Sequence, residues 1–281
     1  LVVQLPYRWL LGLGRALGWG MFQLMGDRRE VARTNLALCF PEMSEIARER
    51  LLRENFASNG IALFEMAMAW WGPRQRLARL AHIEGLEHLN DAAAQGKGVV
   101  LMSLHFTTLE IGAALLGQAV TIDGMYREHR NAAFDFVQRR GRERHNLDAK
   151  AVEREDVRSM LRSLRSGRAI WYAPDQDYGA KYSVFVPFFG HPAATITATA
   201  RFAKVNNSPV IFCSHYRNED NSGYHLYFSK QLENYPSDDE AADATTINQI
   251  IEEAIRKQPD QYLWLHKRFK TQAAGKAARP Y

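Results

Sequence analysis

The chain has 281 residues, of which 46% are hydrophobic and 11% aromatic, so it carries enough apolar side chains for a sizeable core and is not a disordered protein. Its net charge of +5 favours an anionic partner, either nucleic acid or a phosphate-bearing membrane surface. Cys39 and Cys213 stand alone in apolar surroundings, which excludes a disulfide framework or a cysteine metal site and indicates a reducing compartment.

The first 25 residues are rich in Leu, Trp, Gly and Phe and are interrupted by Arg8 and Arg15. Pro6 is well placed to begin a helix, on which the two arginines share one stripe beside a broad apolar face. A clean spanning helix needs about 20 predominantly apolar residues. The pattern therefore favours an interfacial helix at a membrane, and an ordinary buried helix is the alternative. Because the chain begins without Met, we expect a missing upstream segment that anchors it in the membrane.

Residues 27–95 have the pattern of helices, with Asp27 and Ser44 as expected amino-terminal caps. From residue 97 onward, apolar runs alternate with helical stretches, which predicts a mostly parallel sheet flanked by helices. We expect one domain over 1–281, with a mainly helical, membrane-associated region at 1–95 and an α/β catalytic region at 96–281. The predicted helices are 28–38, 44–58, 61–71, 86–95, 107–117, 132–141, 154–165, 194–205 and 242–257, and the apolar runs are 98–104, 121–126, 169–173, 184–187, 209–216 and 224–230.

The string HFTTLE, from His105 to Glu110, directly follows the apolar run GVVLMSL. That run has the length and boundaries of a buried parallel strand, and the residues after the string have the pattern of a helix. His105 is therefore expected at the carboxyl end of a strand, where open α/β sheets bind ligands. A histidine there is well suited to accept a proton near neutral pH.

The spacing between His105 and Glu110 allows two interpretations. The two side chains can pair if His105 lies in the loop and Glu110 in the first helical turn, and Glu110 would then orient the imidazole ring as a general base. Alternatively, Thr107 and Glu110 form a capping box, and the carboxylate only satisfies backbone donors.

Polar side chains also follow two other predicted strands. Arg127 comes directly after the segment TIDGMY, and a guanidinium group in that place is suited to bind phosphate. Asp175 and Asp177 follow the strand that includes Trp171. No cluster has recognisable metal-ligand spacing, so we expect no metal ion.

Several other chemistries are not supported by the sequence. It has no G-x-S-x-G elbow, no phosphate-binding P-loop and no G-x-G-x-x-G fingerprint. No nucleic-acid-binding motif stands beside the basic residues at 139–144, so nucleic acid is not an expected partner.

The chain resembles the late lipid A biosynthesis acyltransferases, the lauroyl and palmitoleoyl transferase group. The matching segments run nearly end to end and are LVVQLPY, NLALCFPEMS, MAWW, HFTTLEIG, WYAPDQDYG, VFVPFFG and QYLWLHKRFKT. His105 and Glu110 fall on the family's His-x-x-x-x-Asp/Glu motif. The resemblance implies a glycerolipid-acyltransferase-like fold and an enzyme at the cytoplasmic face of the bacterial inner membrane. Such an enzyme moves a fatty acyl chain from acyl carrier protein to a hydroxyl of a Kdo-bearing lipid A precursor.

A thioester donor is already activated, so this reaction requires neither a metal nor an organic cofactor. We expect His105 to deprotonate the acceptor hydroxyl, Glu110 to orient His105, and Arg127 to hold an anionic part of a substrate. Asp175 is expected either to position Arg127 or to bind a sugar hydroxyl. Ser103 and Cys213 are expected to be structural, which favours direct transfer over an acyl-enzyme. The alternatives are a thioesterase or hydrolase on the same scaffold and a non-catalytic basic protein that binds a membrane.

Overall fold

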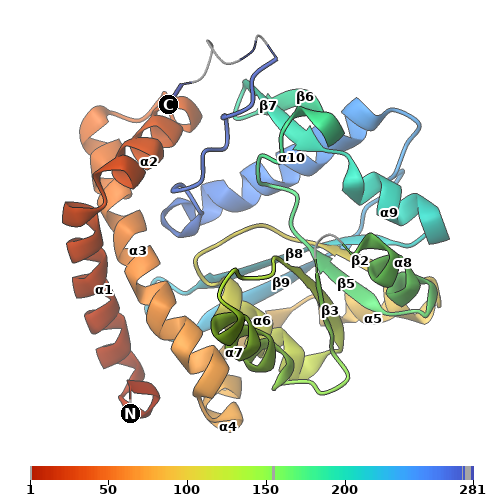
Figure 1. The fold of residues 1–281 in the computed structure, drawn as a ribbon, viewed down its shortest axis with the longest axis horizontal. Helices are drawn as coiled ribbons and strands as arrows, with labels where there is room; N and C mark the ends of the chain where they lie inside the picture. Colours follow the sequence, from red (N-terminus) through yellow and green to blue (C-terminus); the bar gives the residue numbers. More distant parts are fainter. Residues whose placement is uncertain (1, 154–155, 274, 276–279) are drawn as a thin grey trace.

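A seven-stranded sheet lies at the centre of the molecule (Figure 1), for which a computed structural model describes residues 2–153, 156–273, 275, 280 and 281. The strands lie in the order β1–β9–β8–β2–β5–β3–β4. All neighbouring strands are parallel except β8 and β9, so the predicted mostly parallel sheet is confirmed. The strands are β1 (Ala81–Glu84), β2 (Val99–Met102), β3 (Ile122–Tyr126), β4 (Ala151–Glu153), β5 (Ala169–Tyr172), β8 (Val210–Arg217) and β9 (Tyr224–Gln231).

Helices flank this sheet, and a separate hairpin of β6 (Ser183–Phe188) and β7 (His191–Ile196) packs against the carboxyl-terminal helix α10. Strand β2 lies inside the sheet and every residue in it is buried, which explains its continuous apolar sequence. The helices of this part are α5 (Leu86–Ala94), α6 (Leu109–Ala119), α7 (Ala132–Glu143), α8 (Val157–Arg165), α9 (Ala198–Asn206) and α10 (Glu240–Lys257).

The amino-terminal region is helical, as predicted, and consists of α1 (Tyr7–Leu24), α2 (Gly26–Cys39), α3 (Glu45–Trp71) and α4 (Arg74–Ala78). Helices α1 and α3 lie along one side of the molecule (Figure 1). They approach so closely that a Cβ atom on Gly18 would stand 2.3 Å from the carbonyl oxygen of Phe56, and one on Gly60 would stand 2.2 Å from that of Gly14. Glycine at these positions therefore allows backbone-to-backbone packing. Short 3₁₀ turns occur at Val2–Gln4, Ala180–Tyr182 and Pro259–Gln261.

Helix α1 has two different faces. One face is buried against the rest of the protein and includes Leu10, Leu11 and Phe22. The other face presents apolar side chains to solvent, and Trp9 and Trp19 are each 67% exposed. The alternative of a buried helix therefore describes one face of α1, and the other face offers an apolar surface to solvent, so the interfacial helix stays a prediction. Among the described residues, no helix is both long enough and apolar enough to cross a bilayer.

Three sequence-based boundaries were wrong. The two helices predicted at 44–58 and 61–71 are one helix, α3, because Gly60 serves the contact with α1 and does not end the helix. Ser44 caps α3 as expected, but Asp27 lies inside the first turn of α2. The helix predicted from residue 194 begins at Ala198, because residues up to Ile196 pair with β6 as an edge of the hairpin.

For the helix predicted over 154–165, residues 154 and 155 lie outside the described residues. The described part, α8, begins at Val157 and is capped by Asp156, whose side chain accepts a hydrogen bond from the Ser159 backbone. The strands β1, β4 and β7 and the short helix α4 were not predicted.

Candidate active site

His105 and Asp175 meet because their strands are neighbours in register. Met102 of β2 pairs with Tyr172 of β5, and each functional residue follows its strand's paired residue by three positions. Since parallel strands end at the same edge of a sheet, the two side chains reach the same level above β2 and β5.

The carboxylate of Asp175 holds His105 by two hydrogen bonds. His105 Nδ1 lies 2.6 Å from Oδ1, and the backbone N–H of His105 donates to Oδ2 over 2.9 Å. Burial alone would raise the pKa of Asp175, but the attraction and hydrogen bonds of His105 outweigh burial, and the pKa lies below its ordinary value. Asp175 is therefore an ionised acceptor that fixes the proton on Nδ1, and the Nε2 atom of His105 is left to meet a substrate.

Glu110 does not form the predicted hydrogen bond with His105. It lies in the first turn of α6, as expected, but its carboxylate accepts a hydrogen bond from Trp70 Nε1 over 2.9 Å. The same carboxylate accepts hydrogen bonds from the guanidinium group of Arg142, whose Nε is 3.2 Å from both oxygen atoms. The capping box is not formed either, because Thr108 is the N-cap residue and makes no side-chain cap. Glu110 is not needed there because Nδ1 of His105 is already held by Asp175, whose position depends on which strands are neighbours and not on sequence spacing.

The contacts of Glu110 fasten helix α7 to the body of the protein. Arg142 belongs to α7 and Trp70 to the end of α3, so this carboxylate joins three helices. Helix α7 also packs closely against α3, since a Cβ atom on Gly141 would stand 2.5 Å from Trp70 Cγ. Glu110 therefore determines where α7 lies.

A cavity of about 440 Å³ opens beside His105. It follows α6 from Leu109 to Gly117 and β3 from Ile122 to Tyr126, and α7 contributes to its wall. Arg127 lines the cavity with an exposed side chain directly after β3, where the sequence had placed it. Apolar side chains line much of the cavity, namely Leu109, Ala113, Leu116, Ile122, Met125 and Trp171.

Asp177 has a structural task. Its carboxylate accepts hydrogen bonds from the backbone and hydroxyl of Thr271, at 2.6 and 2.8 Å, and from the backbone of Gly179. It thereby ties the carboxyl-terminal segment to the sheet edge. In the part of the chain that the structure describes, no group of three or more His, Cys, Asp or Glu residues is arranged to hold a metal ion.

The loop that carries His105 is held from several sides. The backbone N–H of Thr107 donates to the Gln261 carbonyl over 2.7 Å, and that of Leu263 donates to the His105 carbonyl over 3.1 Å. The hydroxyl of Thr107 lies 2.8 Å from that of Ser58 on α3. These contacts explain how a loop holds a histidine in a fixed place.

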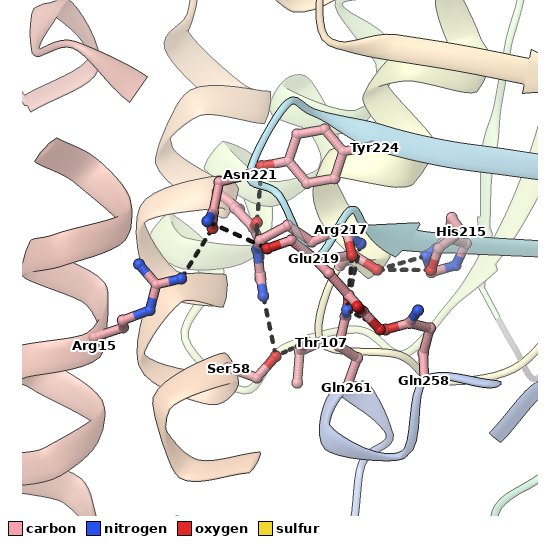
Figure 2. A network of polar contacts seen from close by, with 12 residues as sticks. Arg15, Ser58, Thr107, His215, Arg217, Glu219, Asn221, Tyr224, Gln258 and Gln261 are labelled. Atoms are coloured by element: carbon pink, nitrogen blue, oxygen red, sulfur yellow. Dashed lines mark hydrogen bonds and ion pairs between the residues drawn. The ribbon is translucent and has the colours of Figure 1, made fainter. Parts of the chain in front are cut away.

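A buried ion pair supports the same loop. Arg217 on β8 donates from Nε and Nη2 to the two carboxylate oxygen atoms of Glu65 on α3, at 2.7 and 2.8 Å. Figure 2 shows Arg217 between Ser58, Tyr224 and Gln261, with the Ser58 hydroxyl 3.3 Å from Arg217 Nη1. The sequence patterns did not single out this pair, because an isolated Glu in a helix carries no signal of burial.

The two candidate nucleophiles are buried. Cys213 lies inside the sheet, and burial raises the pKa of its thiol to about 12, which prevents thiolate formation near neutral pH. Ser103, which lies between the end of β2 and the loop that carries His105, is fully buried. Both observations agree with structural roles for these residues.

The two carboxylates should respond differently to neutral replacement. Asp175→Asn should lower the turnover number by on the order of 100-fold or more, because an amide cannot stabilise the imidazolium. Glu110→Gln should instead raise the Michaelis constant and lower the melting temperature, because it weakens the attachment of α7. Steady-state kinetics and thermal unfolding of both variants test this. Equal losses of turnover with unchanged Michaelis constants would contradict the assignment.

Residues 1–271 match a family model described as bacterial lipid A biosynthesis acyltransferase. A lipid A biosynthesis acyltransferase of Haemophilus influenzae is 42% identical over 284 residues, which cover 100% of this chain and 90% of the relative. The lipid A biosynthesis lauroyltransferase of Escherichia coli is 40% identical over 280 residues, with 99% of this chain and 91% of the relative covered. The palmitoleoyltransferase of the same organism is 39% identical over 277 residues, with coverage of 98% and 90%.

Among solved structures, the chain is similar to the 1-acyl-sn-glycerophosphate (LPA) acyltransferase PlsC from Thermotoga maritima. The TM-score is 0.43 and the sequence identity is 10%, over 88% of this chain and 97% of that one.

Proposed function

The chain belongs to the bacterial lipid A biosynthesis acyltransferases, and from this premise we propose that it transfers a fatty acyl chain from acyl carrier protein to a hydroxyl of a Kdo-bearing lipid A precursor. The protein is an acyltransferase of lipid A biosynthesis. The donor, the acceptor and the residues that serve them are the parts that we propose.

The observation that carries the proposal is the His105–Asp175 pair beside a cavity with an apolar lining. In the reaction, the acceptor hydroxyl attacks the thioester carbonyl while its proton passes to His105 Nε2. Asp175 stabilises the resulting imidazolium through Nδ1. The tetrahedral intermediate then expels the thiolate of the carrier, which takes the proton from the imidazolium. The ester product forms, His105 returns to its neutral state, and no cofactor is consumed.

The cavity supports binding of the acyl chain. It follows helix α6, whose 11 residues span about 16 Å. Burial of an aliphatic chain there is favourable by about 0.8 kcal/mol for each methylene group. The reacting carbonyl would then lie at the His105 end and the chain would extend along α6.

Arg127 is the residue that we assign to an anionic part of a substrate. Its guanidinium group lines the cavity from the end of β3 and remains exposed to solvent. A phosphate on the lipid precursor or on the carrier's prosthetic group fits a bidentate guanidinium. Asp175 was expected to position Arg127 or bind a sugar hydroxyl, but its two oxygen atoms are engaged by His105, so its assigned role is to orient that ring.

The function is tested with the purified chain, an acyl-carrier-protein donor and a Kdo-bearing lipid A precursor dispersed in detergent. We expect one acyl group to appear on the precursor, detected by mass spectrometry, and an equal amount of free carrier thiol. Incubation with the donor alone separates transfer from a thioesterase activity. Release of free fatty acid at the same rate with and without precursor would make hydrolysis the function of this site.

We also propose that the exposed face of α1 docks the enzyme on the cytoplasmic surface of the inner membrane. The exposed tryptophans on this helix suit the membrane interface, where indole rings have an apolar body and a polar N–H. Arg8 and Arg15 are exposed on the same helix, although Arg15 also donates to Asn221 Oδ1 over 2.9 Å. Each basic side chain near an anionic surface contributes about 1 kcal/mol.

The double variant Trp9→Ser with Trp19→Ser should bind anionic phospholipid vesicles at least about tenfold more weakly, because it removes apolar area from the docking face. Vesicle sedimentation measures this binding, while activity on a detergent-dispersed precursor should change little. Leu147, 90% exposed and outside α1, supplies the control Leu147→Ser. Equal vesicle binding by the double variant and the wild-type chain would refute docking through α1.

A further inference from the structure

His215 stands beside the catalytic pair and was given no role by the sequence patterns. Phe212 of β8 pairs with Met102 of β2, and His215 follows Phe212 by three positions, as His105 follows Met102. The three neighbouring strands β5, β2 and β8 therefore carry Asp175, His105 and His215 at the same level of the sheet edge. His215 lines the same cavity as His105.

The hydrogen bonds of Thr108 determine which nitrogen of His215 carries the proton. The Thr108 hydroxyl donates to the His215 carbonyl oxygen over 2.8 Å, and this uses its single hydrogen. The same hydroxyl oxygen lies 3.0 Å from His215 Nδ1, so it accepts a hydrogen bond from Nδ1–H. The neutral ring therefore has a lone pair on Nε2. Figure 2 shows His215 on the strand that also carries Arg217.

The Nε2 atom of His215 has no hydrogen-bond partner among the residues that the structure describes, although the side chain is 1% exposed. Burial, together with repulsion from His105, lowers the pKa of His215 to about 4, so the ring stays neutral at physiological pH. An unpaired polar atom inside a protein destabilises the folded state. This cost is removed if a bound molecule supplies the missing donor.

The close packing of α6 keeps the ring in this position. A Cβ atom on Gly112 would stand 2.7 Å from His215 Cγ and 3.0 Å from Nδ1, so glycine is needed where the helix passes the ring. The Thr108 bond and the Gly112 contact both lie on the Nδ1 side. Nε2 lies across the ring from them.

We propose that His215 Nε2 accepts a hydrogen bond from a neutral N–H or O–H group of a substrate in the cavity, and that His215 is a substrate-binding residue of the acyl transfer described above. A lone pair repels an oxyanion, so this nitrogen does not serve the developing negative charge of the intermediate. A weakly basic ring is also a poor competitor of His105 for the proton of the nucleophile. Two kinds of substrate group can donate this hydrogen bond, namely an amide N–H of the acyl donor's thiol arm and a hydroxyl or amide of the lipid acceptor.

Two replacements separate the nitrogens of His215. The amide of asparagine reaches the position of Nδ1, so His215→Asn keeps a partner for Thr108 and removes the acceptor at Nε2. The longer glutamine places its amide oxygen near the position of Nε2. We expect His215→Asn to lower kcat/KM at least about tenfold and His215→Gln to recover most of that loss.

The substrate whose KM rises in His215→Asn identifies the bound group. A higher KM for the acyl carrier donor assigns the thiol arm, and a higher KM for the lipid precursor assigns the acceptor. His145 supplies a matched control, because it is also buried, its pKa is lowered by burial, and it does not line the cavity. Its Nδ1 atom, like Nε2 of His215, has no hydrogen-bond partner within the part of the chain that the structure describes. His145→Asn should leave both KM values unchanged.

Equilibrium binding keeps this proposal separable from the proposed function. A non-hydrolysable acyl-pantetheine analogue and the lipid precursor in detergent are titrated separately into the wild-type, His215→Asn and His215→Gln proteins. Weaker binding of one probe to His215→Asn, with recovery in His215→Gln, supports the assignment even if the wild-type protein shows no transfer. Equal binding of both probes by all three proteins would overturn it, as would equal losses in both variants that follow their melting temperatures.

Discussion

Replacing His105 by alanine should lower acyl transfer by about 10²–10⁴-fold, because the reaction loses the base that takes the proton of the acceptor hydroxyl. The melting temperature should change little, since the side chain is partly exposed and its buried partner Asp175 keeps the backbone hydrogen bond from residue 105. Initial rates with saturating donor and precursor, together with thermal unfolding, give the two quantities.

A histidine elsewhere in the fold provides the control for this variant. His191 contacts the carbonyl of Leu38 from the β6–β7 hairpin and lies outside the cavity, so His191→Ala should retain its activity. Wild-type rates in His105→Ala would remove the general base from the mechanism. A collapse of the folded state in that variant would show instead that His105 is a structural residue.

Glu65→Gln should lower the free energy of unfolding by about 3–5 kcal/mol, because it leaves the buried guanidinium of Arg217 without its counter-charge. Glu65 on α3 also accepts a hydrogen bond from the hydroxyl of Tyr224 on β9 over 2.8 Å, so its carboxylate joins α3 to both β8 and β9. Urea unfolding measures this change. Activity should fall as well, since Arg217 reaches the His105 loop through Ser58 and Thr107.

A double replacement tests whether the cost comes from the uncompensated charge. Glu65→Met combined with Arg217→Met removes both charges and fills similar volume, so it should destabilise the protein less than Glu65→Gln alone. Arg50→Gln breaks an exposed pair with Glu54 and should change stability little. A double variant that is as unstable as the sum of its single variants would show that the two side chains contribute independently.

The sequence located the sheet edge that carries the His105–Asp175 pair, because its signals are local. An apolar run followed by His105 predicts a strand end, and the same logic placed Arg127 and Asp175 at that edge. Local signals do not show which strands are neighbours. Asp175 is 70 residues from His105 and reaches it only because β5 pairs with β2, so spacing favoured Glu110, which is close in sequence but faces Trp70 and Arg142.

The same limit explains why His215 was missed. It sits in the run 209–216, which was correctly predicted as an apolar strand, but its place beside His105 depends on the pairing of β8 with β2. Helix α3 shows a related limit, because Gly60 has the local signature of a helix boundary and only the approach of α1 explains why the helix continues. Distant packing, rather than propensity, decides these cases.

The attachment of the His105 loop to residues 261–263 has a consequence for folding during synthesis on the ribosome. The loop at His105 emerges early in translation, whereas Gln261 and Leu263, which bind its backbone, are added more than 150 residues later. A nascent chain that has already formed β2 and β5 therefore still lacks the two backbone hydrogen bonds that hold the His105 loop. The fixed position of His105 should therefore arise late in synthesis, and a chain that ends before residue 261 should lack an ordered site.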